Sequence, residues 1–178
     1  MTIRIVTDSS CDLPSGLIEQ YGISVLPCYV VVDDQAFKDG VEIQADDFYC
    51  RLLAGGRTPT TAQPTPSDFQ TIYRELIGQG DQIISIHVSS KLSGTLNSAQ
   101  QAKASLNDGS AVEIIDSQLA SIPLGLAVLD AAIMASKGGS VYDIAGQVRQ
   151  SLGLHHGLFA LDTLEYLQKG GRIGKARA

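Results

Sequence analysis

The stretch QIISIHVSSKLSGTLNSAQQA, residues 82–102, contains the transition that decides the fold. Its apolar beginning at 82–88 predicts a buried strand, and the segment that follows the glycine at position 94 predicts a helix. The turn between them is rich in serine, and no Asp or Glu occurs from Gln82 to Asn107. Because the start of a helix exposes unpaired N–H groups and the positive end of a dipole, this turn suits either a bound anion or a simple cap by Ser93.

The rest of the chain continues the alternation of strands and helices. A hairpin that turns at Asp33–Asp34 is predicted from the β-rich segment on either side of those residues. Further buried strands are predicted at 3–7, 111–116 and 155–162, and helices at 14–22, 45–56, 67–80, 124–136, 141–152 and 164–171. This order predicts an α/β fold with a mostly parallel sheet and helices on both faces. In such folds, ligands bind at the carboxyl ends of the strands.

Composition and charge restrict the classes of function. With 178 residues, the chain suits one domain or one domain plus part of another. The net charge of −6 argues against a nucleic-acid partner. The most apolar segment, 119–136, contains Pro123 and Asp130, so a buried helix is expected there and stable membrane insertion is not. The N-terminus lacks the apolar core of a signal peptide, and the expected location is cytoplasmic.

Several residues with catalytic potential favour a structural interpretation. Asp8 follows the first strand, where an aspartate can accept a phosphoryl group or bind a metal, but Ser10 stands where that chemistry prefers a second carboxylate. Turn formation and capping are the favoured use of Asp8. The three cysteines lack zinc-ligand spacing, and no metal site is predicted. The histidines, including His87 in a predicted strand, are interpreted as structural because no GxSxG motif accompanies them.

Two further segments carry polar side chains in loops. RTPTTAQPTP at 57–66 is predicted to be a proline-stiffened loop that either presents threonine hydroxyls or links two elements and caps the next helix. KGGRIGKA at 169–176 lacks the spacing of a phosphate-binding P-loop, because three residues separate Gly170 from Gly174 and Ala176 follows the lysine. It is interpreted as a glycine-hinged loop that presents Arg172 to a carboxylate or phosphate.

Five motifs, taken in their order along the chain, resemble those of the DegV family. They are TDSSCDLP at 7–14, PTTAQPTPSDF at 59–69, SSKLSGTLNSAQQA at 89–102, DS at 116–117 and LDTLEYLQKGGRIGKA at 161–176. The resemblance extends over almost the whole chain, and the last motif is the most specific of the five.

This resemblance implies a function. DegV-like proteins bind fatty acids, and bacterial members present the bound acid to a fatty-acid kinase, which itself binds ATP. The implied role is a binding protein for a long-chain fatty acid, not an enzyme, with no cofactor of its own and a fatty-acid kinase subunit as partner. The implied lipid-binding residues are Thr61 and Ser93 for the carboxylate, Gly94 through its backbone N–H, and Arg172 near the head group and the partner surface.

Other classes stay open, and the sequence departs from the family at two places. The alternatives are a phosphotransferase or hydrolase that uses Asp8 or Ser93, and a small anion-binding or regulatory module without lipid. Ala62 stands where family members commonly have serine, and the family continues well beyond the position of Ala178. Residues 1–160 are therefore expected to form the DegV-type α/β domain, and 161–178 the start of a second subdomain that is largely missing from a truncated chain.

Overall fold

Two β-sheets organise the molecule. The computed structural model describes residues 2–55, 57–106, 109–155, 157, 159–172 and 174. The strands are β1 (Ile3–Asp8), β2 (Ser24–Leu26), β3 (Tyr29–Val32), β4 (Gln35–Lys38), β5 (Thr60–Ala62), β6 (Gln82–His87) and β7 (Val112–Asp116). The helices are α1 (Ser15–Tyr21), α2 (Ala45–Leu53), α3 (Pro66–Gly78), α4 (Thr95–Ala104), α5 (Ser121–Ser136), α6 (Val141–Leu152) and α7 (Glu165–Lys169), with 3-10 turns η1 (Ser9–Cys11) and η2 (Gly109–Ala111).

The larger sheet is parallel, which confirms the predicted α/β fold. Its strand order is β2-β1-β6-β7, and every neighbouring pair runs in the same direction. Ile3 of β1 lies opposite Gln82 of β6, and His87 of β6 lies opposite Asp116 of β7. The carboxyl ends of these strands therefore reach one edge of the sheet, and the polar segments that follow β1, β6 and β7 meet there.

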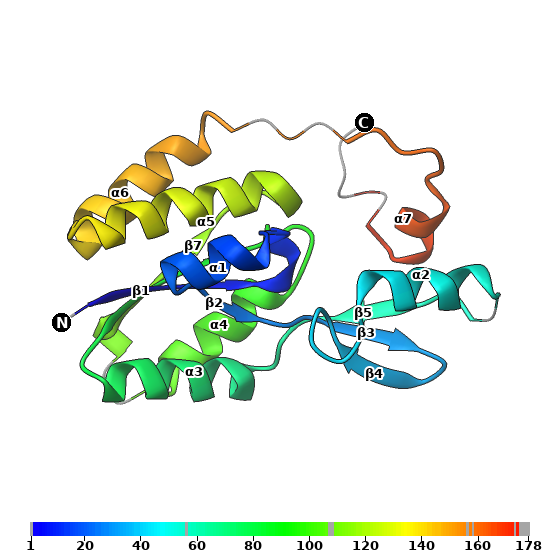
Figure 1. Cartoon of the computed structure of the whole chain (residues 1–178), viewed down its shortest axis with the longest axis horizontal. Coiled ribbons are helices and arrows are strands. Elements are labelled where there is room, and N and C mark those ends of the chain that lie inside the picture. Colours follow the sequence, from blue (N-terminus) through cyan, green and yellow to red (C-terminus); the bar gives the residue numbers. More distant parts are fainter. Residues whose placement is uncertain are drawn as a thin grey trace.

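Helices cover both faces of this sheet, as predicted (Figure 1). Because successive side chains of a strand point to opposite faces, neighbours in β1 enter different cores. Ile5 packs in a cluster with residues of α5 and α6, among them Leu124, Val128, Ile144 and Val148. Val6 packs in the opposite cluster with residues of α3 and α4, among them Phe69, Tyr73 and Ala99. Such burial of aliphatic side chains contributes roughly 1.5–3 kcal/mol each and fixes the sheet between its helices.

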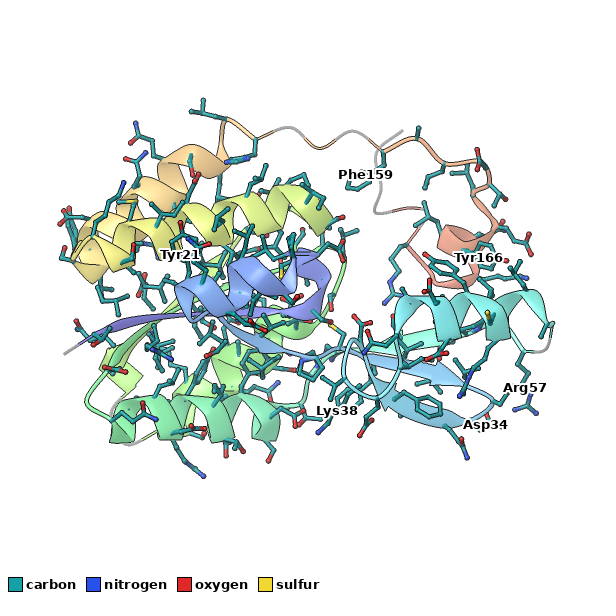
Figure 2. The ribbon with its side chains drawn as sticks, in the orientation of Figure 1. Tyr21, Asp34, Lys38, Arg57, Phe159 and Tyr166 are labelled. Carbon is teal, nitrogen blue, oxygen red and sulfur yellow. The ribbon has the colours of Figure 1, made fainter. Side chains whose placement is uncertain are left out.

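The smaller sheet is antiparallel and has the order β4-β3-β5. Its β3–β4 hairpin turns at Asp33–Asp34, as predicted, and both residues have positive φ, 50° and 63°, as a two-residue hairpin turn requires. Figure 2 shows the side chains of Asp34 and Arg57, which form an exposed ion pair near this turn. The sheet and α2 lie to one side of the parallel sheet, beyond its carboxyl edge (Figure 1).

The prediction of an irregular loop at 57–66 is wrong for the three residues in the middle of that segment. Thr60–Ala62 form β5, in which Thr61 pairs with Val30 of β3. The three paired residues keep their N–H groups, because the prolines of the segment lie outside them, and threonine favours the extended backbone. The expected capping role at the end of the segment is confirmed: Thr65 caps α3 and exchanges hydrogen bonds with Asp68 in a capping box.

The prediction of a strand at 155–162 is also wrong for the residues of that segment that the structure describes. Residues 155, 157 and 159–162 are irregular, and no strand pairs with them. The apolar side chains that suggested a buried strand are largely outside the core, and Phe159 is 63% exposed. The segment leads from α6 to α7, which lies near α2 (Figure 1). The division into a domain at 1–160 and a subdomain start at 161–178 stays a prediction.

Candidate ligand-binding site

A cavity of about 530 Å³ lies where the carboxyl edge of the parallel sheet meets the smaller sheet. Its wall includes residues that follow β1 and β6, residues of β3 and β5, and parts of α2 and α7. The lining is mainly apolar, with side chains such as Val30, Ile43, Phe48, Val88, Leu92 and Leu167. Its volume falls within the roughly 300–1,000 Å³ typical of small-molecule sites. The parallel sheet thus carries its hollow at the edge where such sheets bind ligands.

A second, larger hollow of about 960 Å³ adjoins the first. Thr61, Ser93 and Arg172 line both hollows, and Gly94 lines the second. The four residues selected from the sequence come from three segments that are distant along the chain, and the fold brings them to one boundary between two hollows. Their role in binding stays a prediction that the geometry makes possible.

Thr61 reaches this boundary because β5 pairs with β3. Its side chain is exposed, and its Oγ1 accepts a hydrogen bond of 3.2 Å from Arg172 Nη2. A hydroxyl oxygen that accepts from arginine keeps its own proton free to donate. Thr61 can therefore donate to a carboxylate while it accepts from the guanidinium.

The turn after β6 holds Ser93 at the start of α4. Ser93 N–H donates to the Ser89 carbonyl over 3.1 Å, which closes the turn. Ser93 Oγ lies 2.9 Å from Thr95 Oγ1 and also accepts from Thr95 N–H over 3.3 Å. The residue at the N-cap position of α4 is Gly94, which has no side chain with which to cap the helix. The Ser93 hydroxyl therefore satisfies only one N–H group of the helix, that of Thr95. The positive end of the helix dipole lies beside the second hollow, which Ser93 and Gly94 line.

Arg172 follows α7 and supplies a cation at the same place. Its Nη1 donates to the Gly170 carbonyl over 3.0 Å, while Nη2 binds Thr61. These two bonds hold the guanidinium between its own loop and β5. Figure 2 shows Tyr166 of α7 beside α2, and both line the second hollow. Lys169, at the end of α7, also lines this hollow; it forms an ion pair with Glu165 one turn earlier in α7, and the hydrogen bond from Lys169 to Glu165 raises the pKa of Lys169.

The β1 side of the first cavity is polar. Ser9 Oγ donates to Asp39 Oδ2 over 2.7 Å and accepts from Cys28 N–H over 3.0 Å. Burial, assisted by the negative charges of Asp8 and Asp39, raises the pKa of the Cys28 thiol to about 11. Because the thiol is neutral near pH 7, it lines the cavity as a small apolar group and not as a thiolate nucleophile.

Behind this wall lies a buried chain of polar side chains that sequence reasoning missed. Tyr73 Oη lies 2.7 Å from Ser85 Oγ, which lies 2.6 Å from His87 Nε2, and His87 Nδ1 lies 2.9 Å from Asp8 Oδ2. All four residues are 0% exposed. With the proton of His87 on Nδ1, the Tyr73 hydroxyl donates to Ser85, the Ser85 hydroxyl donates to His87 Nε2, and His87 Nδ1–H donates to Asp8. Every donor among these four side chains then has an acceptor. The separate segments gave no signal of this chain, because it depends on the register of β1 and β6.

Asp8 ends this chain as a fully hydrogen-bonded carboxylate. Besides His87, it accepts from Val88 N–H over 3.1 Å and from both the N–H and the hydroxyl of Ser10. Burial alone raises the pKa of Asp8, but the bonds from His87, Ser10 and Val88 outweigh it and hold the pKa below the ordinary value of 3.8. The capping and turn role predicted for Asp8 is confirmed, since it is the N-cap of η1. The structural interpretation of His87 is confirmed as well.

These contacts bear on the enzymatic alternatives. The carboxylate of Asp8 is enclosed by donors and has no exposed surface from which to reach a substrate. Ser93 Oγ pairs with the hydroxyl of Thr95, and a hydroxyl is not a base that activates a serine. Among the described residues, no group of three His, Cys, Asp or Glu side chains is placed to hold a metal ion. Within those same ranges, no helix combines the length and the apolar character needed to cross a membrane.

The α/β fold thus has a mainly apolar hollow at the carboxyl edge of its sheet, which is where ligands of such folds bind. The chain belongs to the DegV family, a family of uncharacterised proteins whose model matches residues 2–178. This match confirms the resemblance drawn from the five motifs. A DegV domain-containing protein of Caldanaerobacter subterraneus subsp. tengcongensis is 39% identical over 176 residues. The alignment covers 99% of this chain and 62% of that relative, so the chain spans about three fifths of its length.

Three solved structures, two of them of proteins named as DegV, have the same fold. A DegV family protein from Thermus thermophilus, described by its fatty acid binding, has a TM-score of 0.89 at 37% identity over 97% of this chain and 61% of its own. DegV of Bacillus subtilis, a fatty acid binding protein, has a TM-score of 0.87 at 30% identity over 99% of this chain and 62% of its own. A stearic acid-binding protein from Eubacterium ventriosum has a TM-score of 0.83 at 26% identity over 96% of this chain and 60% of its own.

Proposed function

We propose that this protein binds a long-chain fatty acid and acts as a carrier, not as an enzyme. The acyl tail occupies the mainly apolar cavity, and the carboxylate lies at the boundary of the two hollows. There it accepts hydrogen bonds from the hydroxyls of Thr61 and Ser93 and from the backbone N–H of Gly94, with Arg172 near the head group. The protein carries out this role in the cytoplasm.

The observation that carries the proposal is the position of Thr61, Ser93 and Arg172 on one mainly apolar cavity. A fatty acid needs such a combination, because its carboxylate must replace lost water with hydrogen bonds while its tail leaves water. At about 0.8 kcal/mol per buried CH₂, a tail of about fourteen methylenes contributes roughly 11 kcal/mol before the cost of ordering. The tail then supplies the affinity, and the head-group contacts select an acid and fix its orientation.

The relatives support the same ligand class. Solved DegV proteins with TM-scores of 0.89 and 0.87 are described as binding fatty acids, and one with a TM-score of 0.83 as binding stearic acid. These proteins are longer than this chain, and the shared part includes the segments that carry all four head-group residues. The shared part is therefore the natural place for the carboxylate.

We further propose that the carrier presents the carboxylate to a fatty-acid kinase subunit. The head group in this arrangement lies beside the larger of the two hollows, which Arg172 and Lys169 line. A kinase must reach the carboxylate oxygen and neutralise developing phosphoryl charge, and a cation at the opening suits both requirements. The kinase supplies ATP, and the carrier needs no cofactor of its own.

A binding titration of the 178-residue chain with palmitate tests the ligand and the site together. Replacing two hydrogen bonds to a charged group, in Thr61→Val with Ser93→Ala, is expected to weaken binding at least about tenfold. Thr2→Val with Ser136→Ala makes the same chemical changes at exposed residues that line neither hollow and is expected to leave the affinity unchanged. Absence of palmitate binding by the unaltered chain contradicts the proposed ligand, and equal affinities of all three proteins contradict the proposed head-group site.

A further inference from the structure

We propose that Gln63 is an additional head-group residue, whose side-chain amide donates an N–H to the ligand carboxylate and finds room beside Gly94 because that residue has no side chain. This inference rests on the proposed fatty-acid function and extends it to a specificity-determining residue. Gln63 lies just after β5, two positions beyond Thr61, and lines the same cavity as Thr61 and Ser93.

The contact between Gln63 and Gly94 is close. A Cβ atom placed on Gly94 would lie 2.8 Å from Gln63 Nε2 and 3.1 Å from its Cδ. Real Cβ atoms do not approach so closely, so any larger residue at position 94 would displace the amide. The backbone of Gly94, with φ −80° and ψ 4°, does not itself require glycine. The absence of a side chain at Gly94 therefore leaves room for the Gln63 amide, and a Cβ there would push the flexible amide aside.

The amide of Gln63 has hydrogen-bonding capacity to spare. In the part of the chain that the structure describes, no hydrogen bond joins this side chain to another residue. The amide lies instead beside Gly94 at the start of α4, at the wall of the cavity. A primary amide offers two N–H donors, and a carboxylate at this wall accepts one of them.

A neutral donor at this position has a chemical consequence. Hydrogen bonds to a carboxylate are strong because the acceptor is charged, so an amide favours an ionised acid over an alcohol of the same tail. Gln63 would thus contribute to the choice of head group and not to the burial of the tail. A carboxylate in its place would repel the ligand acid and would leave a neutral ligand largely unaffected.

The test is a comparison of palmitate and 1-hexadecanol binding to Gln63→Glu and to Gln100→Glu. Gln100 is exposed on α4, so its variant changes the net charge equally but away from the cavity. Gln63→Glu is expected to weaken palmitate binding at least about tenfold and hexadecanol binding less than about twofold, and Gln100→Glu is expected to change neither. A purely structural effect of position 63 would weaken both ligands alike and would overturn the inference.

A double-mutant cycle tests the contact itself. Gly94→Ala alone is expected to displace the amide and to weaken palmitate binding about as much as Gln63→Ala, roughly fivefold to tenfold. In the Gln63→Ala background, Gly94→Ala is expected to cause no further loss, because the displaced group is already gone. Independent losses that multiply in the double variant overturn the proposed coupling.

The two proposals fail in distinguishable ways. If the unaltered chain binds palmitate and Thr61→Val with Ser93→Ala weakens that binding, while Gln63→Glu does not, the fatty-acid site stands and the role of Gln63 is overturned. If the unaltered chain binds neither palmitate nor hexadecanol, both proposals are overturned together.

Discussion

Arg172 Nη2 donates to Thr61 Oγ1 over 3.2 Å and so joins two residues that are 111 positions apart in the chain. One belongs to β5 of the smaller sheet and the other to the segment after α7. The bond lies at the boundary of the two hollows, and it fixes the C-terminal segment over the cavity through an exposed contact. Exposed hydrogen bonds contribute little to global stability. This bond is therefore expected to affect the local order of the segment that covers the cavity more than the stability of the whole protein.

Removal of this contact is expected to loosen α7 without unfolding the protein. Arg172→Ala should increase amide hydrogen exchange of residues 165–172 severalfold, while the free energy of unfolding falls by less than about 1 kcal/mol. Lys169→Ala, which removes the ion pair with Glu165 but leaves Arg172 in place, serves as the control. Unchanged exchange in Arg172→Ala would show that the bond to Thr61 does not hold this segment.

The pKa of Asp8 predicts how stability depends on pH. The folded-state pKa lies below the ordinary value of 3.8, so the carboxylate contributes stability above about pH 3.8 that is lost as the pH falls through the folded-state value. Asp8→Asn is expected to lose about 3 kcal/mol near neutral pH, because an amide cannot accept from all four donors. Urea unfolding across the pH range should show the difference from the unaltered protein shrinking in acid.

The control for this experiment is Asp130→Asn on α5. Asp130 is exposed, and its carboxylate forms no hydrogen bond with the described residues, so its replacement should leave both the stability and its pH dependence nearly unchanged. A difference between Asp8→Asn and the unaltered protein that stays constant down to strongly acidic pH would contradict a lowered pKa for Asp8.

The order of the buried hydrogen-bonded side chains predicts that Ser85, in the middle, contributes more to the free energy of unfolding than the Tyr73 hydroxyl at the end. Ser85→Ala leaves the Tyr73 hydroxyl and His87 Nε2 without partners, and we expect it to lower the free energy of unfolding by roughly 2–4 kcal/mol. Tyr73→Phe removes only the terminal donor and is expected to cost about 1 kcal/mol. Urea unfolding measures both values.

The double variant sharpens this prediction. Because Tyr73→Phe removes the hydroxyl that Ser85→Ala strands, the double variant should be no less stable than Ser85→Ala alone. Additive losses would mean that the two hydroxyls do not depend on each other and that the chain does not run in the proposed direction.

Local sequence patterns predicted the fold and the general place of the site. The transition at 82–102 predicted the β6–α4 turn correctly, because a buried strand and a helix start are determined by neighbouring residues. Thr61 and Ser93 were selected through the resemblance to the DegV family and not through this local reasoning. Local reasoning missed β5, because pairing of Thr60–Ala62 with β3 depends on a partner about thirty residues earlier.

Contacts between residues that are distant along the chain explain the other differences between prediction and structure. The apolar pattern of 155–162 suggested a strand, but a strand needs a neighbour to pair with, and the described residues of that segment have none. The contact of Asp8 with His87 joins residues 79 positions apart and needs the β1–β6 register to be known first. Gln63 was passed over since one glutamine in a polar loop carries no periodic signal; only its packing on Gly94 distinguishes it.

The close approach of α5 to η1 gives a final prediction about the fold beneath the site. Gly125 is buried, and a Cβ at this position would overlap the backbone carbonyl oxygen of Cys11 and lie 3.2 Å from the Leu13 side chain. Backbone cannot move aside as a side-chain end can, so Gly125→Ala is expected to lower the free energy of unfolding by about 3 kcal/mol or more.

Gly146, in the exposed face of α6, provides the control, because no atom of the described residues lies within 4 Å of a Cβ built there. Gly146→Ala is therefore expected to stabilise the protein by about 0.5–1 kcal/mol through helix propensity. Urea unfolding of the two variants should move in opposite directions, and a tolerated Gly125→Ala would mean that α5 does not pack backbone to backbone on the turn that carries Ser9 and Ser10 to the cavity wall.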